Sequence, residues 1–470
     1  MKRLQRLQRL LVVGLVAVSA ALVATPASAH DPEEFGDHAA SGPAGPDQHS
    51  QNMKLLANVG KAAGTTTQSD LAFWGKHAFA GNYQGFRVLD VSDPEAPAVV
   101  TDFRCNGAQG DISVYRGLLF QSVDAPQNKS SCTSSGTGVT AATPGMFEGV
   151  RIFDISNPAA PVHLRSVSTD CGSHTNTLVP SPETGAVFVY VSSYPLGRAS
   201  LGPNCRRAED GGGHNKISII RVPLAAPASA TVGEYRLDAG TETAVYPLQG
   251  TTFSFTGCHD ISVFTGIDRA AGACLSEGQM WDISNPAAPK FLWRYDNPAV
   301  QPSKIDLFHS ATFSWDGSLV AFGDESGGGG ASRCLDPNDD QGRIWFVNAA
   351  TGKERGSYKV PRVIPGTCTM HNFNFLPIKG RNVLVSSAYT AGTTVVDVDR
   401  LLAGATPAKA EVGFYQPSGG NTWSSYWYNG FVYANDINRG VDIFLLSDRA
   451  RAGARKLPYL NPQTQESLLR

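Results

Sequence analysis

Several patterns that mark common enzyme classes are missing from this sequence of 470 residues. It has no Gly-x-Ser-x-Gly, the turn that presents the nucleophile of many serine hydrolases, and no Gly-Lys-Ser/Thr, which a phosphate-binding loop requires. It also has no Cys-x-x-Cys, so its thiols form neither a zinc-ribbon nor a thioredoxin-like redox pattern. The sequence therefore gives no support to serine hydrolase or nucleotide-binding chemistry.

An excess of charge of one sign is also missing. The chain has 39 Lys and Arg residues against 41 Asp and Glu residues, a formal net charge of −2. Nucleic acids and anionic membranes are bound largely through clustered basic residues. We therefore expect no nucleic-acid partner.

Long helical patterns are absent, and the composition favours short strands. The chain contains 49 glycines and 29 prolines, which interrupt its apolar runs at close intervals. Short apolar runs separated by Gly- and Pro-containing turns are typical of all-β domains. We therefore expect an all-β fold.

The one long apolar run lies near the N-terminus, at residues 10–24. Basic residues precede it and the small-residue site Ala-Ser-Ala follows it, so residues 1–29 are predicted to be a secretory signal peptide. We expect no stable membrane insertion after its removal. Residues 30–52, rich in Gly, Pro, Asp, His and Ser, are predicted to be a disordered lead-in. The mature protein is therefore expected to be secreted, either extracellular or in the cell envelope.

Three stretches of the chain repeat nearly the same nine residues. Each ends an apolar run with Asp and continues with Ser, Asp or Asn, and Pro-x-x-Pro, at residues 89–97, 153–161 and 281–289. Proline cannot donate to a strand ladder, and the Asp or Asn side chain stabilises a turn. Each stretch therefore predicts a strand, a tight turn capped by the Asp, and a second strand.

These stretches resemble the LVIVD repeat, a β-propeller motif of secreted and surface proteins in which an apolar strand closes with Val-Asp-Val-Ser-Asp-Pro-x-x-Pro. Four weaker copies keep the register, with other residues at the Asp position or, once, Asp itself: Arg221, Asn348, Asp397 and Leu445. The resemblance covers most of the chain from about residue 53. It implies an all-β fold, a seven-bladed β-propeller of four-stranded antiparallel blades, and no particular activity.

In this register each repeat supplies one blade, with strands A to D running from the axis outwards. The seventh blade has no convincing outer strand, whereas residues 53–59 have the pattern of one. We therefore predict that this N-terminal strand joins the C-terminal blade and closes the ring, which leaves no open sheet edge. The propeller is expected to span residues 53–448, followed by a C-terminal tail at residues 449–470.

The eight cysteines are predicted to form four disulfides, because their number is even and export exposes them to oxidising conditions. Spacing alone does not fix the connectivity. In the repeat register, however, all eight fall on one face of the ring, either just before strand A or between strands B and C. We call this the top face. The register predicts four pairs: Cys105 with Cys132, Cys171 with Cys205, Cys258 with Cys274, and Cys334 with Cys368.

Four histidines share one register position, at the start of strand A in blades three to six: His174, His259, His309 and His371. Neutral imidazoles converging on the axis would suit one transition metal ion, zinc, copper or iron. Asp260, Asp324 and Glu325 in neighbouring turns are candidates to complete or orient the ligand shell. The alternative is that the histidines hydrogen-bond the loop of the adjacent blade, as buried polar residues often do.

Other polar and aromatic residues of the top face are candidates for ligand binding. Glu325 is the candidate general acid or base, if burial raises its pKa, although a Gly-rich acidic turn is more often solvated. Tyr389 and Trp423 could stack on a flat ligand, although alternating aromatics in strands more often pack between blades. No catalytic residue beyond Glu325 is proposed from the sequence.

The leading functional interpretation is a monomeric, exported binding or scaffold protein. Its disulfide-braced, histidine-rich top face would take a small-molecule or protein ligand. The alternative is a metal-dependent enzyme, an oxidoreductase or hydrolase, with a histidine-ligated metal at the top of the axis. A third interpretation is a structural protein of the cell envelope, which requires that no pocket exists there.

Overall fold

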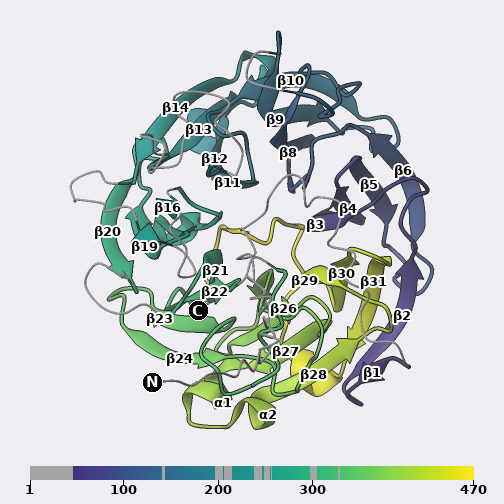
Figure 1. The fold of residues 1–470 in the computed structure, drawn as a ribbon, viewed down its shortest axis with the longest axis vertical. Coiled ribbons are helices and arrows are strands. Elements are labelled where there is room, and N and C mark those ends of the chain that lie inside the picture. The colour runs from purple at the N-terminus through teal and green to yellow at the C-terminus, as the bar shows by residue number, and fades with distance from the viewer. Residues whose placement is uncertain are drawn as a thin grey trace, which may run out of the picture.

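The computed structural model describes residues 46–139, 143–195, 205, 214–237, 246–247, 254–255, 257–296, 304–326 and 329–469. In this part of the chain, seven antiparallel sheets stand around a common axis and form a ring (Figure 1). The predicted seven-bladed β-propeller of four-stranded blades is therefore confirmed. The predicted signal peptide and most of the predicted lead-in lie outside the described residues.

Strand A of each blade faces the axis and is almost wholly buried, because neighbouring blades cover both of its sides. From the first blade to the seventh, the A strands are β3 (Gln68–Trp74), β7 (Ile112–Tyr115), β11 (Thr175–Ser181), β17 (Asp260–Phe264), β21 (Phe308–Phe313), β25 (Phe373–Phe375) and β29 (Thr422–Tyr428). In blades three to six, each begins within two residues of the histidine that the repeat register places at its start.

Strands B and C form the middle of each blade and are rich in β-branched and aromatic residues, as sheets buried on both faces require. The B strands are β4 (His77–Asn82), β8 (Leu118–Gln127), β12 (Ala186–Ser192), β18 (Arg269–Cys274), β22 (Leu319–Asp324), β26 (Val383–Ser387) and β30 (Phe431–Asp436). The C strands are β5 (Gly85–Asp90), β9 (Phe147–Asp154), β13 (Lys216–Pro223), β19 (Glu277–Asp282), β23 (Ile344–Asn348), β27 (Thr393–Asp397) and β31 (Gly440–Leu446).

The outermost D strands expose more of their side chains, because one edge of each faces the rim. They are β6 (Ala98–Arg104), β10 (Val162–Ser168), β14 (Thr231–Arg236), β20 (Lys290–Tyr295), β24 (Glu354–Tyr358), β28 (Glu411–Gln416) and, in the seventh blade, β2 (Met53–Val59). β2 pairs antiparallel with β31, so the N-terminal strand closes the ring as predicted. A short strand β1 (Gln48–His49), in the predicted lead-in, adds to β28.

The repeated Asp caps the turn that ends strand C in the three close repeats. The Oδ1 atoms of Asp90, Asp154 and Asp282 accept hydrogen bonds of 2.9, 2.8 and 2.8 Å from the backbone N–H two residues later. The turn chemistry predicted from Asp-x-Ser-Asx-Pro is thus present in all three copies. These turns lie on the face opposite the starts of the A strands, which we call the bottom face.

The C-terminal segment crosses the bottom end of the axis (Figure 1). Its strand β32 (Tyr459–Leu460) pairs with the end of β3, and β33 (Thr464–Gln465) pairs parallel with the end of β17. Between them, Asn461 exchanges two hydrogen bonds with the backbone of Val114, at 2.8 and 2.9 Å. The segment predicted to be a tail therefore ties blades one, two and four together.

In the described part of the chain, helices are few and short. They are α1 (Val398–Leu402), α2 (Pro407–Ala410), α3 (Asp448–Arg451) and the 3₁₀ turns η1 (Pro182–Thr184), η3 (Pro227–Ser229) and η4 (Thr265–Ile267). η1 and η4 lie in A-to-B turns, and the others lie in connections after C strands. Two short strands, β15 (Tyr246–Pro247) and β16 (Ser254–Phe255), pair with each other between blades three and four. Among the described residues, no helix has both the length and the apolar character needed to span a bilayer.

Candidate metal centre

Four histidine side chains form a row at the top of the axis, where blades three to six begin. They are His174, His259, His309 and His371, and each is at most 2% exposed. The centroids of successive rings lie 4.2, 3.8 and 4.2 Å apart. The shared register of the A strands therefore brings together side chains that are far apart in the sequence.

His174, at one end of the row, is oriented by a buried carboxylate. Its Nδ1 lies 3.0 Å from Asp124 Oδ2, and its Nε2 lies 2.9 Å from His259 Nε2. A neutral His174 that donates from Nδ1 accepts at Nε2, so the proton of the second bond comes from His259. This chain of three residues fixes the tautomer of both rings.

His371, at the other end, is oriented by a main-chain carbonyl. Its Nδ1 hydrogen-bonds the carbonyl oxygen of Trp423. Because a carbonyl only accepts, Nδ1 carries the proton, and Nε2 is the lone-pair nitrogen of the neutral ring. His309 is held similarly, since its Nδ1 hydrogen-bonds Ser310 Oγ, which itself donates to the His371 carbonyl at 3.1 Å.

Glu325, the residue that follows β22, lies between these two rings. Its Oε2 is 3.6 Å from His309 Nε2, and its Oε1 is 3.4 Å from His371 Nε2. The carboxylate is fully buried, and the hydroxyl of Tyr389 donates to Oε1. Lone pairs of two imidazoles therefore face a carboxylate in a buried site, an arrangement that requires a proton or a metal ion between them.

Three of these side chains meet the geometric requirement for a shared ion. His259, His309 and Glu325 each offer a ligand atom, and these atoms all lie within 4.8 Å of one another. A tetrahedral ion with bonds of about 2.0–2.1 Å holds its ligand atoms about 3.3 Å apart. The separation of 3.6 Å between Glu325 Oε2 and His309 Nε2 is close to that value. Imidazoles with one carboxylate are a donor set for zinc, copper or ferrous iron.

Aromatic side chains wall the histidine row. Tyr194 stacks on His259 with centroids 5.5 Å apart, and Tyr389 and Trp423 lie 4.6 and 4.9 Å from His371. All three are buried, so none presents an open face on which a ligand could stack. Burial raises the pKa of Tyr389 well above its ordinary value, and the charge of Glu325 adds to this shift. Tyr389 therefore stays a hydrogen-bond donor to Glu325.

Three buried carboxyl groups line the axis: Asp70, Asp111 and Asp260. In the repeat register, each lies one residue after the position that the histidines occupy in blades three to six. Asn176 donates to Asp111 from its backbone N–H and side-chain amide, at 2.7 and 3.1 Å, and Gln463 donates to Asp70 at 3.1 Å. Burial raises the pKa of all three. The charges of Asp70 and Asp260 raise the pKa of Asp111 further, and the charge of Asp70 raises that of Asp260 further. The site thus holds acidic groups beneath the imidazoles.

A cavity of about 20 Å³ lies between the histidines and these carboxyl groups. A space of this size holds about one water molecule or one ion. The four histidines, the three carboxyl groups and Trp423 all line it. The described residues therefore leave room for an ion at the top of the axis.

Asp324, a predicted ligand-binding residue, is directed to the backbone. Its two oxygens accept hydrogen bonds from the N–H groups of Leu307 and Gly342, at 3.0 and 2.8 Å. Burial raises its pKa to about 8. Asp324 thus braces the loops around Glu325, while Asp260 lines the cavity.

The four disulfides lie on the same face and join the same pairs that the repeat register predicts. They are Cys105–Cys132, Cys171–Cys205, Cys258–Cys274 and Cys334–Cys368. Each links a residue in the connection that precedes an A strand with one in a B-to-C connection, except that Cys274 is the last residue of the B strand β18. The loop after strand β8 (the strand that contains Asp124) and the loop that carries Glu325 are therefore covalently braced.

Some site residues were not identified from the sequence, chiefly Asp124, Ser310 and Asp70. Asp124 lies near the end of strand B of blade two, and Glu325 directly follows strand B of blade five. An acidic residue at the end of an apolar B strand, as at Glu325, was therefore the sequence pattern from which Asp124 could have been predicted. Ser310 directly follows His309, and only the structure shows that its hydroxyl orients that ring.

Comparisons with known proteins identify the repeat. Residues 66–104, 147–169 and 281–297 match the model of the LVIVD repeat, and they contain the three close copies described above. The comparison with curated proteins gives no match. The chain is similar to the crystal structure of the computationally designed Ika8 protein, with a TM-score of 0.46 and 13% identity over 84% of this chain and 100% of that chain. The chain thus contains LVIVD repeats in a seven-bladed ring.

Proposed function

We propose that the protein is an exported β-propeller that binds a transition metal ion at its top face. The ion is held by His259, His309 and Glu325, with His371 beside them. The observation that carries the proposal is the position of the Glu325 carboxylate, which faces Nε2 of His309 and His371 while Nδ1 of each ring is hydrogen-bonded elsewhere. The top face is thus the binding face of a rigid scaffold.

The bridging interpretation accounts for the Nδ1 contacts, because His174 reaches Asp124 of blade two and His371 reaches the Trp423 carbonyl of blade seven. It accounts less well for the Nε2 atoms of His309 and His371 that face Glu325. If the histidines only donated to Glu325, they would form charge-assisted hydrogen bonds of about 2.7–2.9 Å. The separations from Glu325 to His309 and His371 are 3.6 and 3.4 Å. Both rings would also have to be protonated with their centroids 4.2 Å apart, which like charges disfavour. A metal ion satisfies both nitrogens at the observed separations.

The donor set selects the class of ion. Calcium and magnesium prefer oxygen ligands, whereas imidazole nitrogens suit zinc, copper, nickel and iron. Ser310 orients His309 directly, and Asp124 orients His259 through His174, as partners of metal-ligating histidines often do. We therefore propose zinc, copper or ferrous iron.

The size of the cavity favours binding over turnover. Space of about 20 Å³ accommodates an ion but no organic substrate, and the surrounding aromatic rings are buried. The metal-dependent enzyme remains the second proposal, favoured only by the buried carboxyl group of Glu325 beside the ion site, a group that can act as a general acid or base.

Export is part of the same proposal. Four disulfides fit a protein that matures in an oxidising compartment. They also hold the loops of the top face at fixed positions, which lowers the entropic cost of binding an ion there.

The proposal is tested by metal analysis of protein secreted from its native route, followed by calorimetric titration of the metal-free protein with zinc, cupric and ferrous ions. We expect one ion per chain, and a loss of affinity of at least a hundredfold in His309→Ala. His77→Ala, in blade one, is the matched control and should bind like the wild type. Absence of bound metal together with unchanged titrations in His309→Ala and His259→Ala would overturn the proposal.

A further inference from the structure

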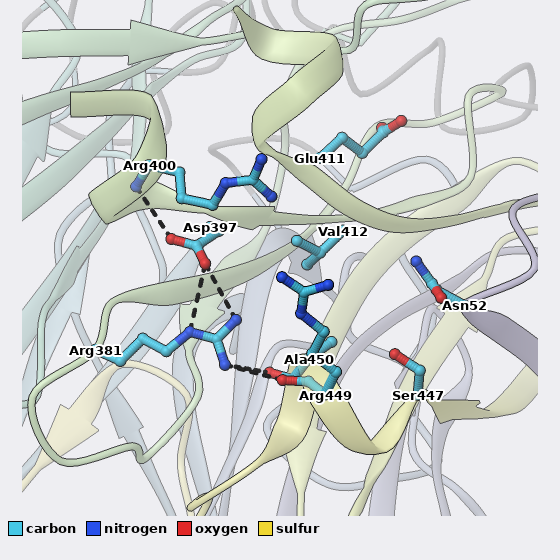
Figure 2. Close-up of a pocket in the computed structure, with 9 residues that line it drawn as sticks. All are labelled: Asn52, Arg381, Asp397, Arg400, Glu411, Val412, Ser447, Arg449 and Ala450. Carbon is cyan, nitrogen blue, oxygen red and sulfur yellow. Dashed lines mark hydrogen bonds and ion pairs between the residues drawn. The ribbon is translucent and has the colours of Figure 1, made fainter. Parts of the chain in front are cut away.

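A second pocket lies on the bottom face of the propeller, between blades six and seven (Figure 2). Its volume is about 360 Å³, which is in the range of small-molecule sites. Its polar lining consists mainly of Arg381, Asp397, Arg400, Glu411, Ser447 and Arg449. The pocket lies at the opposite end of the blades from the histidine row. Asp397 ends the C strand β27, and C strands end on the bottom face, whereas Glu325 follows the B strand β22, and B strands end on the top face.

The two acidic groups of this pocket already have cationic partners. Asp397 forms an ion pair with Arg381 at 3.1 Å and also caps α1 by accepting from the Arg400 backbone N–H. Glu411 forms an ion pair with Arg362, whose guanidinium stacks on Phe414 with 3.7 Å to the ring centroid. The carboxylates are therefore balanced without the other arginines of the pocket.

Two arginines remain without an anion. Arg400, on α1, and Arg449, on α3, are exposed, and among the described residues neither guanidinium has a hydrogen bond or an ion pair. Figure 2 shows both guanidinium groups reaching towards the middle of the pocket. Arginine does not lose its charge in proteins, so the pocket keeps an excess of two positive charges. A protein with a net charge of −2 has no general basic surface that would explain this.

We propose that this pocket binds the phosphate or sulfate ester group of a small polar molecule. A guanidinium donates two parallel hydrogen bonds to such an oxyanion. Two guanidiniums match the two negative charges of a phosphate monoester and exceed by one the single charge of a sulfate ester. The hydroxyl of Ser447 and the side-chain amide of Asn52 line the same space and can donate to the anion or to the rest of the ligand.

The shape of the pocket indicates a ligand larger than the bare anion. Its volume of about 360 Å³ leaves room beside the arginines for a sugar-sized group, and Val412 and Ala450 supply an apolar wall. Blades six and seven pack directly against each other, and Asn52 lines the pocket just before β2, which completes the seventh blade, so the site belongs to the folded propeller. It does not depend on the metal centre of the top face.

The test is calorimetric titration of the full chain at low ionic strength with inorganic phosphate, glucose 6-phosphate, glucose 6-sulfate and glucose. We expect at least one of the two esters to bind at least tenfold more tightly than inorganic phosphate, and glucose not to bind. The affinity should fall as salt is added, because the contact is ionic. Which ester binds more tightly identifies the anion.

The variants Arg400→Gln and Arg449→Gln should each weaken binding at least tenfold, while their melting temperatures stay near that of the wild type. The matched control is Arg165→Gln, an exposed arginine on β10 in blade two, which should leave binding unchanged. Failure of both esters to bind, or an unchanged Kd in the Arg400→Gln/Arg449→Gln double variant, would overturn the proposal. Binding of inorganic phosphate alone, with both esters rejected, would overturn the assignment to an ester.

Discussion

The hydroxyl of Tyr389 donates a hydrogen bond to Glu325 across the boundary between blades five and six. It orients the one carboxylate that faces both His309 and His371, and it leaves the second oxygen of that carboxylate directed at His309. The buried phenol keeps its proton because burial raises its pKa. Tyr389 is therefore a positioning residue for the candidate metal centre, whereas Glu325 is a candidate ligand.

This difference predicts two sizes of effect. Glu325→Gln removes the only carboxylate in the candidate ligand set and should lower metal affinity at least a hundredfold. Tyr389→Phe removes only the orienting hydrogen bond and should lower the metal affinity about tenfold, which is typical of residues that hydrogen-bond a metal ligand. Competition titration with a chromogenic chelator measures both. Equal affinities in the Glu325→Gln variant and the wild type would show that Glu325 is no ligand.

The carboxyl groups beneath the histidines predict an unusual dependence of stability on pH. Burial raises the pKa of Asp70 and Asp111, and the charge of Asp70 raises that of Asp111 further. The folded state therefore keeps protons that the unfolded chain releases above its ordinary pKa of about 3.9. Their contribution to stability is complete below that value and is lost as the pH rises through the raised folded pKa.

Asp111→Asn should remove part of the stability loss that occurs as the pH rises. The Asn side chain keeps an oxygen for the two donors of Asn176 and adds an amide that can donate to Asp70. We expect the free energy of unfolding of the variant to exceed that of the wild type by on the order of 1 kcal/mol at pH 7.5, and by less at pH 4.5. Urea titrations at several pH values measure it. Asp93→Asn, which places at an exposed turn the residue found in the other two repeats, is the control and should show no such trend.

The features that were predicted from the sequence are those that the repeat determines locally. Asp90 and its equivalents end strand C and cap the next turn within two residues, so the pattern alone shows where each blade turns. The histidines follow from the same register, because equal positions in successive repeats meet at the axis. The cysteine pairs follow as well, since both members of each pair lie on the face where those histidines begin their strands.

Contacts that break the repeat could not be predicted. Asp124 belongs to the ten-residue strand β8, whose B-to-C connection has no close match in the other repeats. The pocket of Arg400 and Arg449 combines the connections that follow β27 and β31 with Asn52, which precedes β2. The C-terminal segment carries only two-residue strands, and its position depends on side-chain bonds to blades that precede it by hundreds of residues.

The disulfides predict a graded loss of stability. Cys334–Cys368 spans 34 residues and Cys258–Cys274 spans 16. Because a cross-link lowers the entropy of the unfolded chain more when its loop is longer, replacing each pair by alanines should cost about 4 and about 3 kcal/mol respectively. Guanidinium titrations of the two double variants measure the losses. Stability equal to the wild type in both would show that the top face is held by packing alone.

The C-terminal segment stabilises the ring from its bottom end. Asn461 is buried and makes both of its hydrogen bonds to the backbone of Val114, at the innermost strand of blade two. Asn461→Ala leaves that N–H and carbonyl buried without their partner, so the free energy of unfolding should fall by about 2–3 kcal/mol. Lys456→Ala, an exposed change in the same segment, should leave it unchanged. If both variants unfold like the wild type, the segment contributes nothing to the stability of the propeller. If Asn461→Ala alone is destabilised, the C-terminal segment is part of the fold, because it connects blades one, two and four.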